Sequence, residues 1–307
     1  MGSETTPIGE NMGDWGIPEV TPPGTYGTDT LAMADGTTIF YRYWRVADAA
    51  APALVLVHGM GAHTGWFIDM GNQLSRRGLN VYMDDHRGFG RSGGPRGHVR
   101  QGAIYLEDLK QFLTQVRSLH PASPLFLCGH SMGGIFATYV AAVGKGQASP
   151  ALSGLILINP WIKDSVKVKP TALLGTVLGG MTGSDRLFKR EVDTEQMTLV
   201  PAATRMLNAD NYWVRLQSQS FLYQITLLRQ RILGQARRVQ TPALVIQTEG
   251  DRTLVQAATR QFYLQLGSKD KTWKTYPGLA HDFEFEPERG TLDSDIADWV
   301  LAHAPAA

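Results

Sequence analysis

Residues 124–134 read Pro-Leu-Phe-Leu-Cys-Gly-His-Ser-Met-Gly-Gly, and this stretch decides the fold. It places Ser131 in a Gly-x-Ser-x-Gly frame directly after an apolar run typical of a buried strand, and the apolar residues 135–143 predict a buried helix. A strand that turns sharply into a helix strains the serine backbone, so Gly129 and Gly133 can carry little side chain. The pattern predicts a nucleophile elbow that exposes the Ser131 hydroxyl. The alternative is an ordinary glycine turn with an idle serine.

Strand and helix patterns alternate on both sides of this elbow. Five more apolar runs predict strands, at residues 53–57, 79–83, 155–158, 243–247 and 272–276. Helical patterns separate them, at residues 66–77, 102–119, 255–266 and 292–301. Segments 28–33 and 38–44 predict an antiparallel pair joined at an Ala-Asp-Gly turn. We therefore expect an α/β fold with a mostly parallel twisted sheet and helices on both faces.

The alternation breaks between residues 161 and 239. This segment has no strand pattern of similar quality, and it contains an apolar stretch at 172–181 and a helical stretch at 212–233. Residues 1–25 are rich in Gly, Pro, Thr and acidic residues, which predicts an arm laid over the surface. The expected organisation is an N-terminal arm (1–25), one catalytic core (26–160 and 240–307) and a helical cap or lid (161–239).

Composition excludes several classes of protein. Of the 307 residues, 43% are hydrophobic and 19% are charged, which is ordinary for a globular chain with a sizeable core. Lys plus Arg is 29 and Asp plus Glu is 28, so no net field would attract nucleic acid. The single cysteine, Cys128, excludes an internal disulfide and is interpreted as a packed thiol. With neither a secretory signal nor an apolar run long enough for a membrane span, we expect a cytoplasmic protein.

Three residues follow the order of a nucleophilic triad. A serine hydroxyl needs an imidazole to accept its proton, and a carboxylate must fix the tautomer of that imidazole. After a nucleophile elbow, the acid and the histidine follow in this order on the loops of later strands. Asp251 follows the strand 243–247, and His281 follows the strand 272–276. We predict Ser131 as nucleophile, Asp251 as the orienting acid and His281 as the general base.

Other carboxylates and histidines compete for these roles. Glu249 lies two residues early, at the strand end, and Asp282 is adjacent to the predicted base in sequence and cannot easily brace it. His130 lies inside the elbow, where its side chain is expected to point away from that of the serine, and His58 is interpreted as a structural hydrogen-bonding residue. The remaining histidines are expected to be exposed or satisfied: His63, His86, His98, His120 and His303.

Acyl transfer also needs donors aimed at the developing oxyanion. The backbone N–H of Met132, directly after the nucleophile, is one candidate, and that of Met60 in the loop His58-Gly-Met-Gly61 is the other. The alternative for this loop is a simple glycine turn. Residues 85–93 lack the glycine spacing of a nucleotide-binding loop and predict a rigid turn held by Asp and Arg contacts. No motif requires a metal or another cofactor.

At these residues the chain resembles the α/β-hydrolase superfamily. Within it, the chain is similar to the monoacylglycerol lipase and lysophospholipase group, also placed with serine aminopeptidase-like hydrolases. Five pieces carry the resemblance: His58-Gly-Met-Gly61, residues 85–92, residues 129–134, Gly250-Asp251 and His281. The resemblance implies that the helical insertion is a lid over an acyl-binding channel. It also implies that Ser131, Asp251, His281 and the Met60 and Met132 amides perform catalysis, and it assigns no substrate-binding residue in the cap.

We therefore expect a serine carboxylester hydrolase that cleaves a neutral hydrophobic ester, such as a monoacylglycerol, through an acyl-enzyme intermediate. The expected partner is a small-molecule ester, with transient contact between the cap and a lipid surface. The alternatives are an amidase or peptidase on the same triad, a hydrolase of polymeric or aromatic esters, acyl transfer to an acceptor other than water, and a noncatalytic ligand-binding protein. Two apolar sets in the cap suit either an acyl group or internal packing: residues 172–181, and Trp213, Phe221, Leu222 and Ile225.

Overall fold

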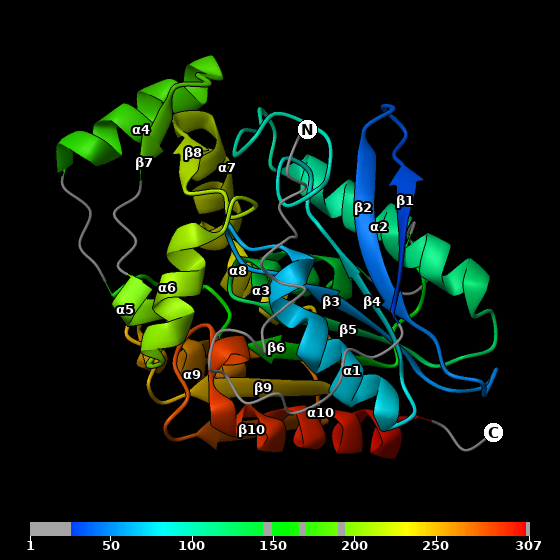
Figure 1. The fold of residues 1–307 in the computed structure, drawn as a ribbon. Helices are drawn as coiled ribbons and strands as arrows, with labels where there is room; N and C mark the ends of the chain where they lie inside the picture. Colours follow the sequence, from blue (N-terminus) through cyan, green and yellow to red (C-terminus); the bar gives the residue numbers. More distant parts are fainter. Residues whose placement is uncertain (1–25, 144–148, 166–169, 190–193, 305–307) are drawn as a thin grey trace, which may run out of the picture.

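The computed structural model describes residues 26–143, 149–165, 170–189 and 194–304 (Figure 1). An eight-stranded sheet forms its centre, in the order β1-β2-β4-β3-β5-β6-β9-β10. The strands are β1 (Gly27–Ala32), β2 (Thr38–Trp44), β3 (Ala53–Val57), β4 (Asn80–Asp84), β5 (Leu125–His130), β6 (Gly154–Ile158), β9 (Ala243–Thr248) and β10 (Lys271–Tyr276). The pairs β1–β2 and β2–β4 are antiparallel and the others are parallel, so the expected mostly parallel sheet is confirmed. The predicted arm lies outside the described residues.

Helices cover both faces of this sheet (Figure 1). One face packs against α2 (Ala103–Leu119), α3 (Met132–Ala141), α8 (Ile232–Ala236) and α9 (Gln256–Gln265), and the other against α1 (Ile68–Arg76) and α10 (Gly290–His303). Short 3₁₀ helices occupy Thr64–Phe67, Phe283–Phe285 and Pro287–Arg289. Strand residues alternate between the two cores: Val55 and Leu127 lie in one, Leu54 and Phe126 in the other. Burial on both faces explains why the central strands are continuous apolar runs.

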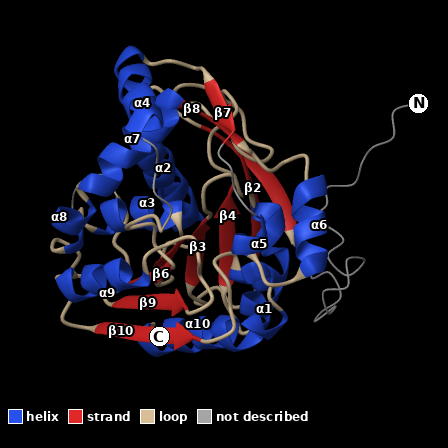
Figure 2. Cartoon of the chain, turned by 90° about the vertical axis from the view of Figure 1, so that its left-hand side faces the viewer, coloured by secondary structure: helices blue, strands red, loops and turns tan. Residues whose placement is uncertain are grey.

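Between β6 and β9 the described chain is mainly helical. It contains α4 (Pro170–Thr182), α5 (Thr194–Met197), α6 (Pro201–Ala209), α7 (Gln219–Gln230) and α8. A short antiparallel pair, β7 (Leu187–Lys189) and β8 (Leu216–Ser218), lies among these helices. Figures 1 and 2 show α4, α7, β7 and β8 grouped together in the upper part of each view, far from β10.

The prediction of one helical stretch over residues 212–233 is wrong at its start. Asp210 Oδ1 accepts hydrogen bonds from the amides of Tyr212 and Trp213, which holds this region in a turn. The next residues pair with β7 as strand β8. The Ser218 side chain then accepts from the Phe221 N–H and caps α7, so the helix begins at Gln219. Of the predicted apolar row, Trp213, Phe221 and Ile225 are buried, which favours its interpretation as internal packing.

Glycine packing shapes the turn between β5 and α3. Ser131 has φ 52° and ψ −115°, a backbone conformation that residues with a side chain rarely adopt. A Cβ atom added to Gly129 would lie 2.5 Å from the Gly133 carbonyl oxygen. One added to Gly133 would lie 2.1 Å from the Val57 carbonyl oxygen in β3. These distances confirm that the positions flanking the serine have no space for side chains.

The turn after β4 is rigid in the way the sequence predicts. Asp85 Oδ1 accepts from the Thr64 amide at 2.6 Å, and Oδ2 accepts from the Arg91 amide at 2.7 Å. The Arg87 guanidinium donates two hydrogen bonds of 2.8 Å to the Asp108 carboxylate, and it also binds Asp35. Hydrogen bonds from Arg87 hold the pKa of the Asp35 carboxyl below its usual value. Asp and Arg contacts therefore fix this turn.

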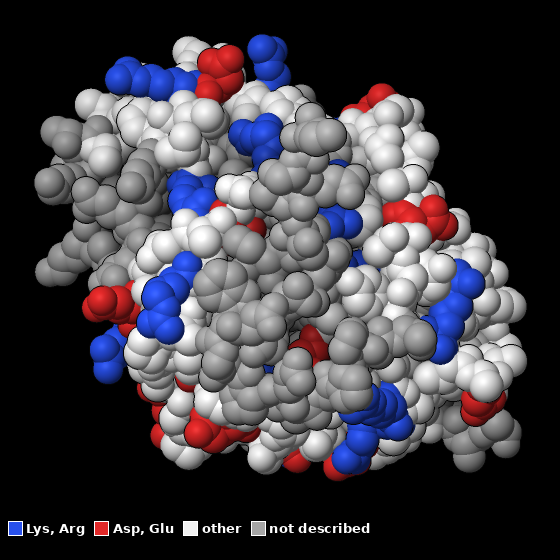
Figure 3. Space-filling view, viewed as in Figure 1, with Lys and Arg blue, Asp and Glu red and all other residues white. Residues whose placement is uncertain are grey.

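Three smaller features agree with the composition. Cys128 is fully buried in β5, and burial raises the pKa of its thiol, as expected for a packed side chain. Acidic and basic side chains are interspersed on the described surface that Figure 3 shows. Within the described ranges, no helix combines the length and the apolar character needed to cross a membrane.

We predict that Gly133→Ala lowers the melting temperature by several degrees. The added methyl group must displace the Val57 carbonyl; overpacking costs about 1–3 kcal/mol, and each kcal/mol shifts the midpoint by about 2–4 °C in domains approaching this size. Thermal unfolding followed by circular dichroism measures the change. Gly234→Ala is the matched control, since its Cβ would meet no atom within 4 Å. Equal midpoints for the two variants would contradict the packing account.

Candidate active site

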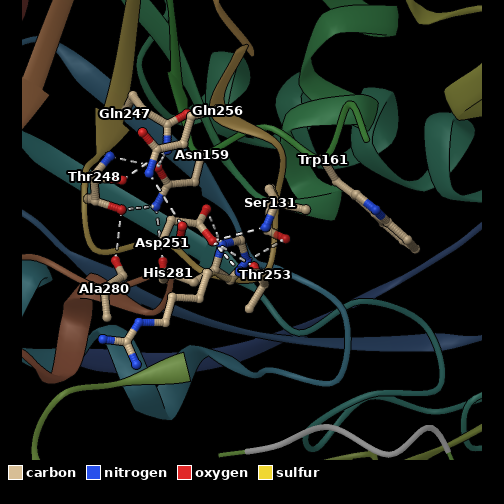
Figure 4. A network of polar contacts seen from close by, with 12 residues as sticks. Ser131, Asn159, Trp161, Gln247, Thr248, Asp251, Thr253, Gln256, Ala280 and His281 are labelled. Carbon is tan, nitrogen blue, oxygen red and sulfur yellow. Dashed lines mark hydrogen bonds and ion pairs between the residues drawn. The ribbon is translucent and has the colours of Figure 1, made fainter. Parts of the chain in front are cut away.

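Ser131, His281 and Asp251 meet at one edge of the sheet (Figure 4). They lie on the segments that follow β5, β10 and β9, respectively. His281 Nε2 is 3.0 Å from Ser131 Oγ, and His281 Nδ1 is 2.8 Å from Asp251 Oδ2. Because an ionised carboxylate only accepts hydrogen bonds, the proton of the neutral ring lies on Nδ1, and Nε2 is left to accept from the serine. This arrangement can move a proton from the hydroxyl to the imidazole.

The Asp251 carboxylate is buried but well supplied with donors. Its Oδ1 accepts from the Thr253 amide and hydroxyl, both at 2.8 Å, and from the Leu254 amide at 3.1 Å. Burial alone would raise the pKa of Asp251, but the imidazole of His281 and the donors of Thr253 outweigh it and lower this pKa. The carboxylate is therefore ionised at neutral pH and can stabilise an imidazolium ion.

The two competing carboxylates have different surroundings. Glu249 is exposed at the end of β9. Asp282 is buried, its amide donates to the Met197 carbonyl at 2.9 Å, and its Oδ2 has no hydrogen-bond partner among the described residues. Burial raises the pKa of Asp282 to about 6. Asp251, rather than either of these, supplies the hydrogen bond to His281 Nδ1.

Both predicted oxyanion donors lie on segments next to the serine. Met132 is the first residue of α3, and the first N–H groups of a helix have no acceptor within that helix. The loop that carries Met60 packs against the serine, since a Cβ added to Gly59 would lie 3.2 Å from Ser131 Cβ and 3.7 Å from Oγ. An oxyanion formed at Ser131 would thus lie between two backbone segments.

His58 holds the start of this loop. Its Nδ1 donates to the Gly59 carbonyl at 2.7 Å, and its Nε2 accepts from the His86 amide at 3.0 Å. Burial lowers the pKa of His58 well below its usual value, so the ring is neutral and can fill both roles. These contacts agree with its interpretation as a structural residue.

The far end of the loop is fixed to the helical insertion. His63 Nε2 and Trp66 Nε1 both donate to Asp210 Oδ2, at 2.8 and 2.7 Å. The Val214 amide also donates to the Gly61 carbonyl at 3.0 Å. The segment that carries Met60 is therefore bonded to the turn after β4 at one end and to the insertion at the other.

We predict that Asp210→Ala lowers the unfolding free energy by at least about 2 kcal/mol. It leaves the buried donors of His63 and Trp66 without their acceptor, and each such loss costs about 1–3 kcal/mol. Urea unfolding measures the change. Asp298→Ala is the control, because its ion pair with Arg77 is exposed and such pairs contribute about 0–1 kcal/mol. Similar losses of unfolding free energy in Asp210→Ala and Asp298→Ala would contradict a stabilising role for the buried contact of Asp210 with His63 and Trp66.

Two buried residues beside the triad make contacts that the sequence analysis missed. His130 Nε2 lies 3.0 Å from the His281 carbonyl oxygen, and Asn159 Nδ2 lies 3.1 Å from the same atom. Asn159 has φ 42°, in the left-handed region that asparagine tolerates better than most residues. An asparagine at the end of a predicted strand was the available signal, but its partners are more than 80 residues away in sequence.

One group of described side chains has the proximity that a metal site needs. Potential ligand atoms of His130, His281 and Asp282 all lie within 4.8 Å of one another. However, the two ring nitrogens of His281 already contact Asp251 and Ser131. An ion held through His281 would displace a hydrogen bond of the triad, so this donor set does not fit a resident metal.

Comparisons with known proteins identify the family. The sequence profile of the family described as serine aminopeptidase, S33, matches residues 48–288. The monoacylglycerol lipase of Mycolicibacterium smegmatis is 27% identical over 281 residues, which cover 91% of this chain and 98% of that protein. The human monoglyceride lipase is 28% identical over 284 residues, 90% of this chain and 91% of that protein.

Solved structures support the same fold. A soluble variant of monoglyceride lipase from Saccharomyces cerevisiae, in complex with a substrate analog, has a TM-score of 0.83 at 22% identity and covers 95% of this chain and 100% of that chain. An α/β hydrolase from Penicillium sp. sh18 has a TM-score of 0.70 at 18% identity and covers 91% of this chain and 99% of that chain. The predicted resemblance is thus confirmed. The chain belongs to the serine aminopeptidase S33 family, and it is a lipase-like serine hydrolase with the α/β-hydrolase fold.

Proposed function

We propose that this protein hydrolyses neutral hydrophobic carboxylic esters, with monoacylglycerols as the substrate class, through an acyl-enzyme on Ser131. The observation that carries the proposal is the hydrogen-bonded series from Ser131 Oγ through His281 to Asp251. The relatives named as monoacylglycerol and monoglyceride lipases match over nearly their whole length, which supports an ester rather than an amide as the substrate.

The reaction uses each of these groups in turn. Ser131 Oγ attacks the ester carbonyl carbon while its proton passes to His281 Nε2, and ionised Asp251 stabilises the resulting imidazolium. The oxyanion accepts hydrogen bonds from the Met60 and Met132 amides. His281 then gives its proton to the departing alcohol, which leaves an acyl group on the serine. A water molecule, deprotonated by His281, attacks this ester and releases the fatty acid.

Residues 161–239 act as a lid on the core formed by residues 26–160 and 240–307. Two observations support this role: the Val214 amide joins this segment to the Gly61 carbonyl in the loop after β3, and Ser131 and His281 are only 8% and 7% exposed. On α4, four apolar side chains are between 52% and 72% exposed: Leu173, Leu174, Leu178 and Met181. An apolar helix surface of this kind suits transient contact with the lipid phase that holds a long-chain substrate.

We predict that Ser131→Ala abolishes ester hydrolysis. Asp251→Asn should lower kcat about 10⁴-fold, as in serine proteases, because the imidazole is no longer held in the productive tautomer. Glu249→Gln is the matched control and should retain nearly full activity. The assay compares monoacylglycerols and 4-nitrophenyl esters over a series of acyl lengths. A nearly active Asp251→Asn beside an inactive Glu249→Gln would refute the choice of acid.

The same assay separates the ester proposal from its nearest alternative. A matched aminoacyl amide should be cleaved far more slowly than the corresponding ester, since an amine is a poorer leaving group than an alcohol. Faster cleavage of the amide would instead assign the triad to a peptidase.

We predict that the double substitution Leu174→Ser and Leu178→Ser weakens binding to phosphatidylcholine vesicles about 30-fold. Partial burial of each leucine in lipid is worth about 1 kcal/mol. Co-sedimentation measures binding, while kcat on a water-soluble 4-nitrophenyl ester should stay unchanged. Leu264→Ser is the control, because Leu264 is 59% exposed on α9, outside the lid. Equal vesicle binding by the wild-type protein, the double variant and Leu264→Ser would contradict the proposed lipid contact.

A further inference from the structure

Two buried side chains that have no role in the proposed chemical steps contact the main chain of His281. His130 Nε2 and Asn159 Nδ2 lie 3.0 and 3.1 Å from the His281 carbonyl oxygen. Because a carbonyl oxygen can only accept, both nitrogens are donors, and the proton of the neutral His130 ring is on Nε2. Both side chains are completely buried. The carbonyl of the proposed base therefore accepts two hydrogen bonds from buried side chains.

These two anchors come from the strand ends that also hold the nucleophile. His130 is the last residue of β5 and directly precedes Ser131. Asn159 directly follows β6, and the last residue of that strand, Ile158, accepts a hydrogen bond of 3.0 Å from the Ser131 amide. The ends of β5 and β6 thus contact the main chains of both His281 and Ser131.

The Asn159 side chain is fixed on both of its polar atoms (Figure 4). Nδ2 donates a second hydrogen bond to Thr248 Oγ1 at 2.7 Å, and Oδ1 accepts from the Thr248 amide at 2.9 Å and from Gln247 Nε2 at 3.2 Å. Its left-handed backbone is a sparsely populated conformation, which persists only where the surrounding contacts fix it. With four hydrogen bonds, the amide has a single orientation available.

The His130 ring is held in a neutral state. Burial, together with the neighbouring His281, lowers the pKa of His130 to about 3. The two ring centres are 5.1 Å apart, so a charged His130 would oppose the imidazolium that His281 must become. A neutral ring donates the same hydrogen bond without that repulsion.

We propose that His130 and Asn159 are positioning residues of the reaction, which hold the His281 carbonyl so that Nε2 stays within reach of Ser131 Oγ. This inference rests on the proposed roles of Ser131 and His281. The base lies on a loop beyond β10, and a displacement of about 1 Å in a reacting group can cost about 100-fold in rate. Neither anchor touches the reacting atoms, so each acts through the geometry of the base.

The test begins with the donor of His130. We expect His130→Leu to lower kcat on a water-soluble 4-nitrophenyl ester by about 10–100-fold, with KM within about twofold, because the ester-binding surface is unchanged. His130→Gln places an amide N–H near the position of Nε2 and should recover at least about tenfold of this loss. A His130→Leu enzyme with normal kcat, or a glutamine variant no better than leucine, would overturn the proposal.

Asn159 is tested against another amide of the same network. Asn159→Gly keeps the left-handed backbone accessible while it removes both donors, and we expect a loss in kcat similar to that of His130→Leu. Gln247→Met is the matched control, since Gln247 Nε2 donates to Asn159 Oδ1 and to the Thr248 carbonyl rather than to the His281 carbonyl. Equal losses of kcat in Asn159→Gly and Gln247→Met would show that Asn159 only stabilises the fold and would contradict its role in positioning His281.

A spectroscopic readout separates this proposal from the proposed function. The proton between His281 Nδ1 and Asp251 should give a downfield ¹H resonance that requires no substrate and is lost in Asp251→Asn. We expect this signal to broaden in His130→Leu and to return in His130→Gln. If Ser131→Ala still hydrolyses esters, the proposed function fails, while the resonance still tests the anchor. A sharp wild-type signal in His130→Leu would refute the anchor alone.

Discussion

The left-handed backbone of Ser131 is the constraint on which the rest of the site depends. At φ 52° this one residue turns β5 into α3, which directs its hydroxyl out of the sheet and makes Met132 the first residue of the helix. The conformation survives because Gly129 and Gly133 allow the strand, the helix and β3 to approach at distances that a Cβ would prevent. Hydrogen bonds to Ile158 and from Trp161 then fix the serine main chain against the end of β6.

From this fixed point, polar contacts extend along the sheet edge and into the insertion. On one side, His130 and Asn159 connect the elbow to the loop of His281. On the other, His63 and Asp210 connect the loop of Met60 to the insertion. A movement of the proposed lid would therefore reach the proposed oxyanion donor directly. The contacts of His130 and Asn159 support the proposal that they keep His281 Nε2 at 3.0 Å from Ser131 Oγ.

The features that could be predicted from the sequence are those that depend on residues close together in the chain. Glycine spacing and an apolar run were enough to predict the elbow, and strand alternation located Asp251 and His281 after the correct strands. The start of α7 was missed because it depends on Asp210 and on pairing with β7, which lies nearly 30 residues before β8. The contacts of His130 and Asn159 were missed for the same reason: His130 meets a carbonyl 151 residues away. No local periodicity encodes such contacts.

The most direct measurement is a crystal structure of the protein after reaction with an alkyl fluorophosphonate. The account predicts one covalent adduct on Ser131 Oγ, with the phosphoryl oxygen about 3 Å from the amides of both Met60 and Met132. It also predicts that His281 keeps its hydrogen bond to Asp251. An adduct on another residue, or a phosphoryl oxygen that points away from both amides, would contradict the account.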